Sequence, residues 1–177
     1  FELAGYLVTA YVPDVGPRIA GARIRPRFRL PESWQLPFKV SISTEVGFNK
    51  RSFEANTVTL EIRPIIEKEL GKWYLSFNPD FSKSLRGIDS HRGFEFEPGM
   101  KVSYAVSKKL EPGIEYYAAT GPVTHFESLH DQHHLIFPTV DINAGADWEL
   151  NFGVGRGLTG TSERWVIKWI VGYRFSF

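Results

Sequence analysis

The stretch Arg23-Ile24-Arg25-Pro26-Arg27-Phe28-Arg29-Leu30 alternates arginine with apolar residues without a break. Successive side chains of a β-strand point to opposite faces, so a strand here places four guanidiniums on one face and apolar side chains on the other. No segment of the chain keeps apolar residues at the i, i+3, i+4, i+7 spacing of an amphipathic helix for three turns. The stretch therefore predicts a strand with one charged and one apolar face.

The same alternation recurs along the rest of the chain. Several segments alternate for 11 to 14 residues, whereas strands of soluble sheets typically have about 5–6 residues. A strand that crosses a membrane needs about 9–11 residues. We predict an all-β fold, an antiparallel up-and-down transmembrane β-barrel, as a single domain over residues 1–177. About ten strands are visible, an even number that can close as it stands, and twelve is the alternative number if N-terminal strands are missing. The further segments are 1–12, 38–49, 57–67, 73–82, 94–107, 114–118, 136–144, 148–154 and 165–177.

Composition excludes several classes of protein. The 177 residues carry 21 Lys and Arg against 20 Asp and Glu, a net charge of +1, which lacks the basic excess expected of a nucleic-acid binder. The sequence contains no run of 18 apolar residues, so it does not predict a transmembrane helix. The chain has no Cys, so it has no disulfide, thiolate metal site or Cys nucleophile.

The predicted connections alternate in length. Short turns at 70–72, 108–111 and 145–147 alternate with longer polar loops at 13–20, 50–56, 83–93, 120–133 and 159–163. Short turns on one side and long loops on the other are typical of outer-membrane barrels. Aromatic residues fall near both ends of the strands, as in the two aromatic girdles of such barrels. The alternative is a soluble lipocalin-like barrel. Dense Arg, Lys and Glu on the polar faces favour the membrane barrel.

The last segment, Trp165 to Phe177, resembles the C-terminal strand of bacterial outer-membrane β-barrels, which alternates hydrophobic residues and ends on an aromatic residue. The resemblance implies that Tyr173, Phe175 and Phe177 form a signal for the barrel-assembly machinery. It also implies a location in the outer membrane of a Gram-negative-type bacterium, in contact with its lipid and lipopolysaccharide. In hairpin spacing the chain is similar to transporters grouped under the phenol-degradation (MetA-pathway) label, from which no functional residue is carried over.

The polar faces define the candidate pore lining. The Arg23 to Arg29 ladder forms either an anion path or phosphate clamp, or a row paired with carboxylates of neighbouring strands. Nine cations face nine anions, so we expect a salt-bridged interior. Besides Glu67 and Asp80, the predicted lining residues are Arg23, Arg25, Arg27, Arg29, Lys39, Glu45, Glu61, Arg63, Glu95, Glu97, Lys101, Glu115, Asp141, Glu149, Lys168 and Arg174.

The loop around residues 124–134 carries several histidines. His130, His133 and His134 offer ligands of the kind that transition metals accept, although a solvated polar loop explains the same composition. Ser128, His130 and Asp131 are contiguous, whereas a catalytic triad needs partners on separate rigid elements. We expect no enzymatic activity and no cofactor.

The predicted function is passive transport through a narrow channel for small solutes. The alternative is a structural or accessory barrel of an envelope assembly, with an interior plugged by its own salt bridges. Both require an apolar outer surface in contact with lipid. The residues expected on it are Ile24, Phe28, Val40, Ile42, Leu60, Phe96, Val102, Leu150, Ile167 and Trp169.

Overall fold

The computed structural model describes residues 1–177 except 13, 144, 146–147 and 174–177. The described chain forms twelve β-strands and one short 3-10 helix, Glu32–Trp34. None of its helices has the length and apolar character needed to span a membrane. The strands are β1 (Glu2–Val12), β2 (Gly16–Arg29), β3 (Lys39–Asn49), β4 (Val58–Leu70), β5 (Trp73–Asn78), β6 (Phe81–Arg86), β7 (Glu95–Phe96), β8 (Gly99–Tyr104), β9 (Leu110–Ala119), β10 (His133–Asn143), β11 (Trp148–Gly157) and β12 (Trp165–Tyr173).

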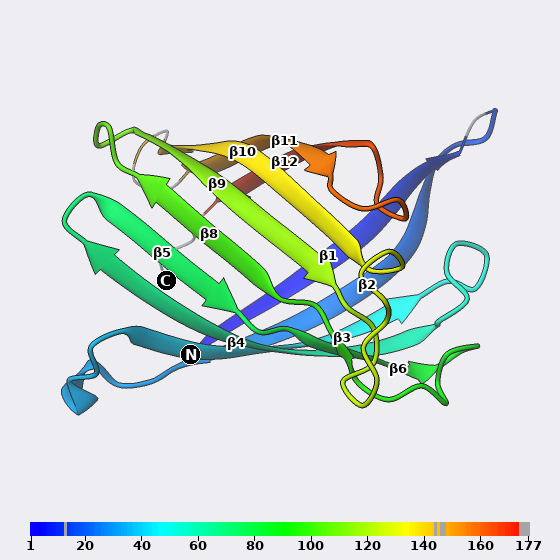
Figure 1. The fold of residues 1–177 in the computed structure, drawn as a ribbon. Coiled ribbons are helices and arrows are strands. Elements are labelled where there is room, and N and C mark those ends of the chain that lie inside the picture. Colours follow the sequence, from blue (N-terminus) through cyan, green and yellow to red (C-terminus); the bar gives the residue numbers. More distant parts are fainter. Residues whose placement is uncertain (13, 144, 146–147, 174–177) are drawn as a thin grey trace.

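The strands form one antiparallel up-and-down sheet (Figure 1). Hydrogen-bonded neighbours follow the order β1-β2-β3-β4-β5-β8-β9-β10-β11-β12, while β6 pairs with β4 beyond the end of β5 and with β7. Thus β5 and β6 continue one another along β4, as do β7 and β8 on the next strand position. The ten positions of this path correspond to the ten predicted segments, so the predicted all-β, antiparallel, up-and-down class is confirmed.

Prolines interrupt the two divided strands. Pro79 lies between β5 and β6, and Pro98 lies between β7 and β8. Proline has no backbone N–H to donate to a ladder, and regular pairing is interrupted at these two positions. The alternation of side chains continues through both breaks, which is why the sequence predicts one strand where the structure has two.

Two strands extend into segments predicted as loops. The prediction of a longer loop over residues 13–20 is wrong, because β2 begins at Gly16 and pairs directly with β1. Positive φ angles of 63° at Asp14 and 86° at Gly16 allow the tight reversal. Likewise, β6 continues to Arg86 within the loop predicted from residue 83. The longer connections that remain, 50–57, 87–94, 120–132 and 158–164, define the loop end of the sheet, and the opposite end is called the turn end.

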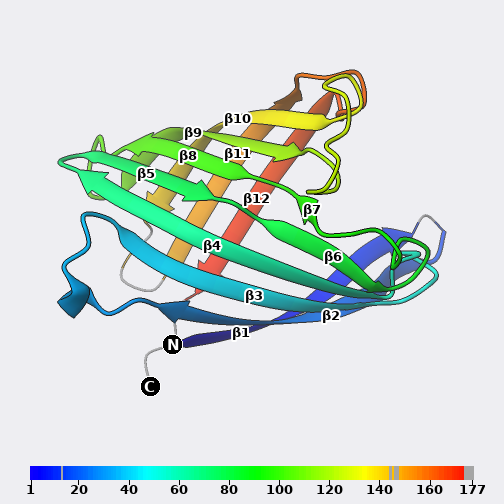
Figure 2. The ribbon, with the colours of Figure 1, turned by 60° about the horizontal axis from the view of Figure 1, so that its bottom comes forward.

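The sheet curves around a central space, so that β12 turns back toward β1 (Figures 1 and 2). These two strands are the ends of the hydrogen-bonded path within the described residues. They run in opposite directions, because the path has an even number of up-and-down positions.

Burial across the sheet is the reverse of that in a soluble protein. On β3, Ser41, Ser43 and Glu45 are buried, whereas Ile42 and Phe48 between and beyond them are 44% and 49% exposed. In the described part of the chain, the buried hydrophobic residues are Ala20, Ala118 and Phe137, and the buried polar ones are Ser41, Ser43, Glu45, Asp80, Ser103, Glu115 and Thr139. The interior is therefore polar, and the outer surface is apolar.

The residues predicted on the apolar outer surface follow the same pattern. Of these ten residues, six are exposed and four are half-buried. The exposed ones are Ile24, Phe28, Ile42, Val102, Ile167 and Trp169, and the half-buried ones are Val40, Leu60, Phe96 and Leu150.

Candidate functional site in the polar interior

A first polar cluster joins β2 to β5. Arg27 donates from Nε to Ser41 Oγ at 3.1 Å, and its NH2 lies 3.5 Å from Glu67 Oε2. Tyr74 donates its hydroxyl to Glu67 Oε1 at 2.5 Å. Arg27 and Glu67 lie on strands separated by β3, so their contact spans the intervening strand on the inner face of the sheet.

A second polar cluster joins β8 to β12. Lys101 Nζ lies 2.5 Å from Asp141 Oδ2 and 3.3 Å from Glu115 Oε1. Lys168 of β12 donates to the same Glu115 carboxylate, and Asn151 Nδ2 donates to Asp141 Oδ1 at 2.7 Å. Glu115 is only 3% exposed. A buried carboxylate needs such charge partners to remain ionised, so the two lysines and Glu115 form one unit.

Aromatic side chains fill the interior beside the second cluster. Phe137 is 4% exposed and packs edge-on against Tyr117 at a centroid distance of 5.7 Å. Lys168 lies over the Tyr117 ring at 5.4 Å. A Cβ at Gly155 would lie 2.4 Å from the Phe137 ring, so glycine is required there for this ring to enter the interior. The β9–β12 side is therefore densely filled.

A third group surrounds Arg63 on β4. Arg63 donates from Nε to Asp80 Oδ2 at 2.6 Å, and its NH2 lies 2.7 Å from Glu61 Oε1. Asp80 is 5% exposed and lies in the break between β5 and β6. Nearby, Arg23 of β2 pairs with Glu45 of β3 at 2.9 Å.

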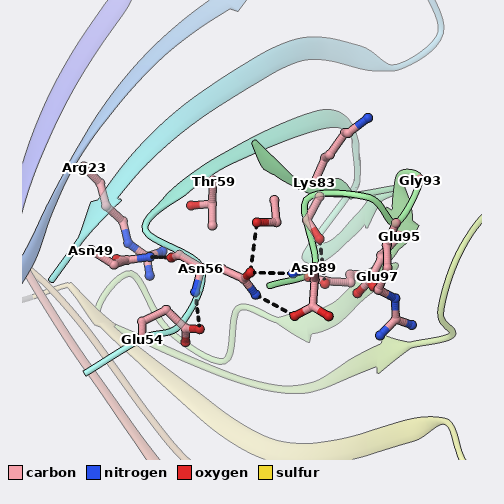
Figure 3. Close-up of a pocket in the computed structure, with 13 residues that line it drawn as sticks. Arg23, Asn49, Glu54, Asn56, Thr59, Lys83, Asp89, Gly93, Glu95 and Glu97 are labelled. Carbon is pink, nitrogen blue, oxygen red and sulfur yellow. Dashed lines mark hydrogen bonds and ion pairs between the residues drawn. The ribbon is translucent and has the colours of Figure 1, made fainter. Parts of the chain in front are cut away.

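Two cavities lie on the inner face of the sheet. The loop-side cavity, of about 300 Å³, is lined by Arg23, Asn49, Glu54, Asn56, Thr59, Ser82, Lys83, Ser84, Asp89, Arg92, Gly93, Glu95 and Glu97 (Figure 3). The turn-side cavity, of about 230 Å³, is lined by Arg27, Ile65, Glu67, Tyr74, Ser76, Asn78, Met100, Lys101, Glu115 and Tyr117. The turn-side cavity is thus bounded by the first cluster on one wall and the second cluster on the other.

Asn56 holds two loops together over the loop-side cavity (Figure 3). Its Nδ2 donates to Asp89 Oδ2 at 2.8 Å, and its Oδ1 accepts from Ser84 Oγ at 3.0 Å and from the Asp89 backbone N–H at 3.1 Å. Gly87 has a φ of 147°, and a Cβ there would lie 2.4 Å from Asn56 Cα. The loops 50–57 and 87–94 are therefore fixed at the mouth of this cavity.

Several buried polar atoms of the interior have no hydrogen-bond partner among the described protein atoms. An unpaired buried polar group costs about 1–3 kcal/mol, and water normally satisfies such groups where the site is polar. The interior is therefore expected to hold water. These atoms are Arg23 Nε, Ser43 Oγ, Asp80 Oδ1, Thr139 Oγ1 and Asn151 Oδ1.

Three other predicted lining residues, Arg25, Arg29 and Lys39, lie outside these clusters. Arg25 donates to the Tyr6 hydroxyl and lies 4.6 Å above that ring, so a phenol lies beside this guanidinium. Lys39 pairs with Glu69 at 2.8 Å at the turn end, close enough to Arg29 for a Coulombic interaction.

The remaining predicted residues lie at the loop end or outside the described part. Glu95 pairs with Arg92 at 3.0 Å, and Glu97 accepts from Ser82 Oγ at 2.8 Å. The Glu149 side chain and residues Arg174, Phe175 and Phe177 lie outside the described residues, whereas Tyr173 ends β12 and packs against Trp148 at 4.9 Å.

The structure does not bring the three candidate metal ligands together. His133 and His134 are consecutive in β10, so their side chains leave opposite faces. Both ring nitrogens of His134 already contact protein, Nδ1 with Tyr116 and Nε2 with Gln132. Two hydrogen bonds hold the pKa of the Asp131 carboxyl below its usual range. The bond from Ser128 has the larger effect and the bond from His130 the smaller. Among the described residues, no group of three or more His, Asp or Glu side chains has a metal-binding arrangement.

Sequence reasoning missed the phenols and amide of the interior. Tyr74, Tyr117 and Asn151 lie at polar positions of their strands, and that parity was the available signal. Arg92 and Glu127 pair at 3.1 Å between two loops, where no periodicity exists to place them.

No protein-family model matches this sequence, and no curated protein shows significant similarity to it.

Proposed function

We propose that the chain closes into a transmembrane β-barrel in the outer membrane of a Gram-negative-type bacterium and acts as a narrow passive channel for small solutes. The observation that carries the proposal is the reversed burial on β3, where Ser41, Ser43 and Glu45 are buried and Ile42 and Phe48 are exposed. In water, exposed apolar strand faces favour association. In a bilayer, the same faces contact hydrocarbon and the polar faces line a lumen.

Strand lengths support a membrane location. β2 has 14 residues, β4 has 13, and β3 and β10 have 11 each. About 9–11 residues suffice for a tilted strand to cross the hydrocarbon layer. These strands are therefore long enough to cross the layer and to leave residues at both interfaces.

Exposed aromatic rings mark both ends of the strands. At the turn end, Trp73 packs edge-on against Tyr104, and Trp148 packs in the same way against Tyr173, each pair at 4.9 Å. At the loop end, Trp165 is 62% exposed and lies under the guanidinium of Arg156 at 4.9 Å. Aromatic rings favour the headgroup level of a bilayer. Rings at the turn end and at the loop end therefore match the two aromatic girdles of a membrane barrel.

Closure between β1 and β12 follows from the same proposal. An open sheet edge carries unpaired N–H and C=O groups, which are not tolerated in hydrocarbon. The two end strands run antiparallel, as pairing in an even-stranded barrel requires. We therefore expect the β1 and β12 edges to pair with each other in the membrane.

The expected width of the lumen supports a channel for small solutes. A barrel of about eight strands is filled by side chains, and one of 16–18 leaves a wide channel. With ten strand positions, the cavities of about 300 and 230 Å³ leave room for small solutes and water between ion-paired walls.

Membrane fractionation and planar-bilayer recording test the proposal. The chain should fractionate with the outer membrane, require detergent for extraction, and give small single-channel conductance steps after reconstitution. A chain that is soluble and monodisperse without detergent contradicts the membrane assignment.

A second function is a structural barrel with a plugged lumen. The contacts of Lys101 and Lys168 with Glu115, together with buried Phe137, favour it because they link β8, β9 and β12 across the interior. A barrel that inserts and folds but never conducts, even when Lys101 is replaced by Gln, supports this function over the channel.

A further inference from the structure

Arg63 lies between the two cavities of the interior. On β4, Thr59 lines the loop-side cavity, and Ile65 and Glu67 line the turn-side cavity. Glu61 and Arg63 occupy the inward positions between them. Any solute that passes from one cavity to the other must therefore pass this level of β4.

The neighbouring strand position has the same order. Asn78 lines the turn-side cavity and Ser82 lines the loop-side cavity, with Asp80 between them. Asp80 accepts the Nε–H of Arg63 at 2.6 Å. On the next strand position, Gly99 lies between Glu97, which lines the loop-side cavity, and Lys101, which lines the turn-side cavity. The ion pair thus lies at the boundary of both cavities on adjacent walls.

The guanidinium of Arg63 is fixed at this boundary from both sides. Glu61 and Asp80 contact it at 2.7 and 2.6 Å. Arg63 is also close enough to Tyr117 of β9 for a Coulombic interaction. β9 lies three positions from β4 in the sheet, so the charge of Arg63 acts beyond the adjacent strands.

The boundary is rich in carboxyl groups. Four of them lie there, and Glu61 is within Coulombic range of the other three. Among the described residues, one buried oxygen of this group, Asp80 Oδ1, has no hydrogen-bond partner. The carboxylates are Glu45, Glu61, Asp80 and Glu97.

We propose that Arg63 is the constriction residue of the channel, which narrows the passage between the two cavities and reduces the cation preference of the carboxylates around it. This inference rests on the proposed channel function. Removal of the guanidinium widens the passage and takes away the cation that faces the Glu61 and Asp80 carboxyl groups. Carboxylates that line a narrow pore favour cations.

Thiol labelling tests the constriction directly, because the chain has no Cys. Ser82→Cys places a thiol in the lining of the loop-side cavity, and Ser76→Cys places one in the lining of the turn-side cavity. A charged, bulky methanethiosulfonate reagent is added to liposomes from the loop side. With Arg63 present, the thiol at position 82 should react several-fold faster than the thiol at position 76.

Arg63→Gln should remove that difference by accelerating reaction at position 76 several-fold, and should leave the rate at position 82 unchanged. The same variant should raise single-channel conductance and shift the reversal potential toward that of the cation. Arg23→Gln is the matched control, because Arg23 lines the loop-side cavity and has one carboxylate partner at 2.9 Å. Far-UV circular dichroism confirms that each variant is folded.

The outcomes separate the constriction from the channel itself. A conducting protein in which Arg63→Gln changes neither the labelling rate at position 76 nor the reversal potential overturns the role of Arg63 and leaves the channel intact. A folded protein that does not conduct with either residue at position 63, and whose two thiols are both unreactive, overturns the channel and the constriction together.

Discussion

Arg27 of β2 and Glu67 of β4 meet across the intervening strand β3, with 3.5 Å between Arg27 NH2 and Glu67 Oε2 and a hydrogen bond from Arg27 to Ser41 beneath the pair. The arginine ladder therefore does not present four equivalent free cations. Within it, Arg23 and Arg27 pair with carboxylates, whereas Arg25 lies against the Tyr6 phenol.

The contrast between Arg27 and Arg25 gives the first prediction. Arg27→Gln should raise conductance and shift the reversal potential toward the cation, because Glu67 then lacks its guanidinium beside the turn-side cavity. Arg25→Gln removes the same charge from the same strand, beside a phenol, and should have a smaller effect. Planar-bilayer recording in a salt gradient compares the two variants. Equal shifts from both, starting from a strongly anion-selective parent, would indicate an open anion path along the ladder.

The outward position of Ile42 and Val102 gives the second prediction. Ile42→Arg and Val102→Arg should each destabilise the membrane-folded state by about 2–4 kcal/mol if the site lies at the bilayer midplane. Phe48→Arg, near the loop end of the same strand as Ile42, is the control and should cost only about 0–1 kcal/mol near the interface. Urea titration of folding into lipid vesicles measures the differences. Neutral effects at both midplane positions argue against contact with lipid.

Deletion of Phe177 should impair assembly in cells more than stability in vitro. The resemblance of residues 165–177 to the C-terminal strand of outer-membrane barrels implies that this residue is part of the assembly signal, whereas Phe177 is one of 26 aromatic residues in the chain and its loss removes little apolar surface. The folded yield in the outer membrane is compared with the urea midpoint of the refolded protein. Equal yields for the intact and the shortened chain contradict the prediction.

Barrel closure predicts slow amide exchange in both end strands. Pairing of β1 with β12 protects the amides of both their edges, so hydrogen–deuterium exchange in Glu2–Val12 and Trp165–Tyr173 should be as slow as in β10. In an open sheet, alternate amides of the two end strands have no ladder partner and exchange rapidly. Fast exchange restricted to these two strands in lipid would show that the barrel is not closed by them.

Period-two alternation predicted the ten strand positions of the sheet and the face that carries the charges, but not every strand boundary. The predicted segment 38–49 corresponds to β3, Lys39–Asn49, because a strict alternation leaves one arrangement with all charges on one side. The breaks at Pro79 and Pro98 were not predicted, since parity continues across both of them. The early start of β2 was missed because Arg18 and Pro17 give no apolar alternation.

Individual ion pairs could not be predicted from alternation alone. The match of nine cations to nine anions indicated a paired interior, but the pairing depends on register and on sheet curvature. Lys168 and Glu115 lie on strands three positions apart, β12 and β9. Similarly, the Asp80 side chain meets Arg63 at a break in its strand, a position that sequence spacing does not specify.

Depth-dependent fluorescence quenching in brominated lipid tests the central claim, an apolar barrel surface in contact with a bilayer, most directly. Variants keep only Trp169, which is 73% exposed in the middle of β12, or only Trp34, which is 60% exposed at the turn end, with the other tryptophans replaced by Phe. We predict that bromines near the acyl-chain ends quench Trp169 most strongly and that bromines near the headgroups quench Trp34 most strongly. Fluorescence of Trp169 that is insensitive to bromine at every depth, in a folded chain, would contradict the membrane-spanning barrel.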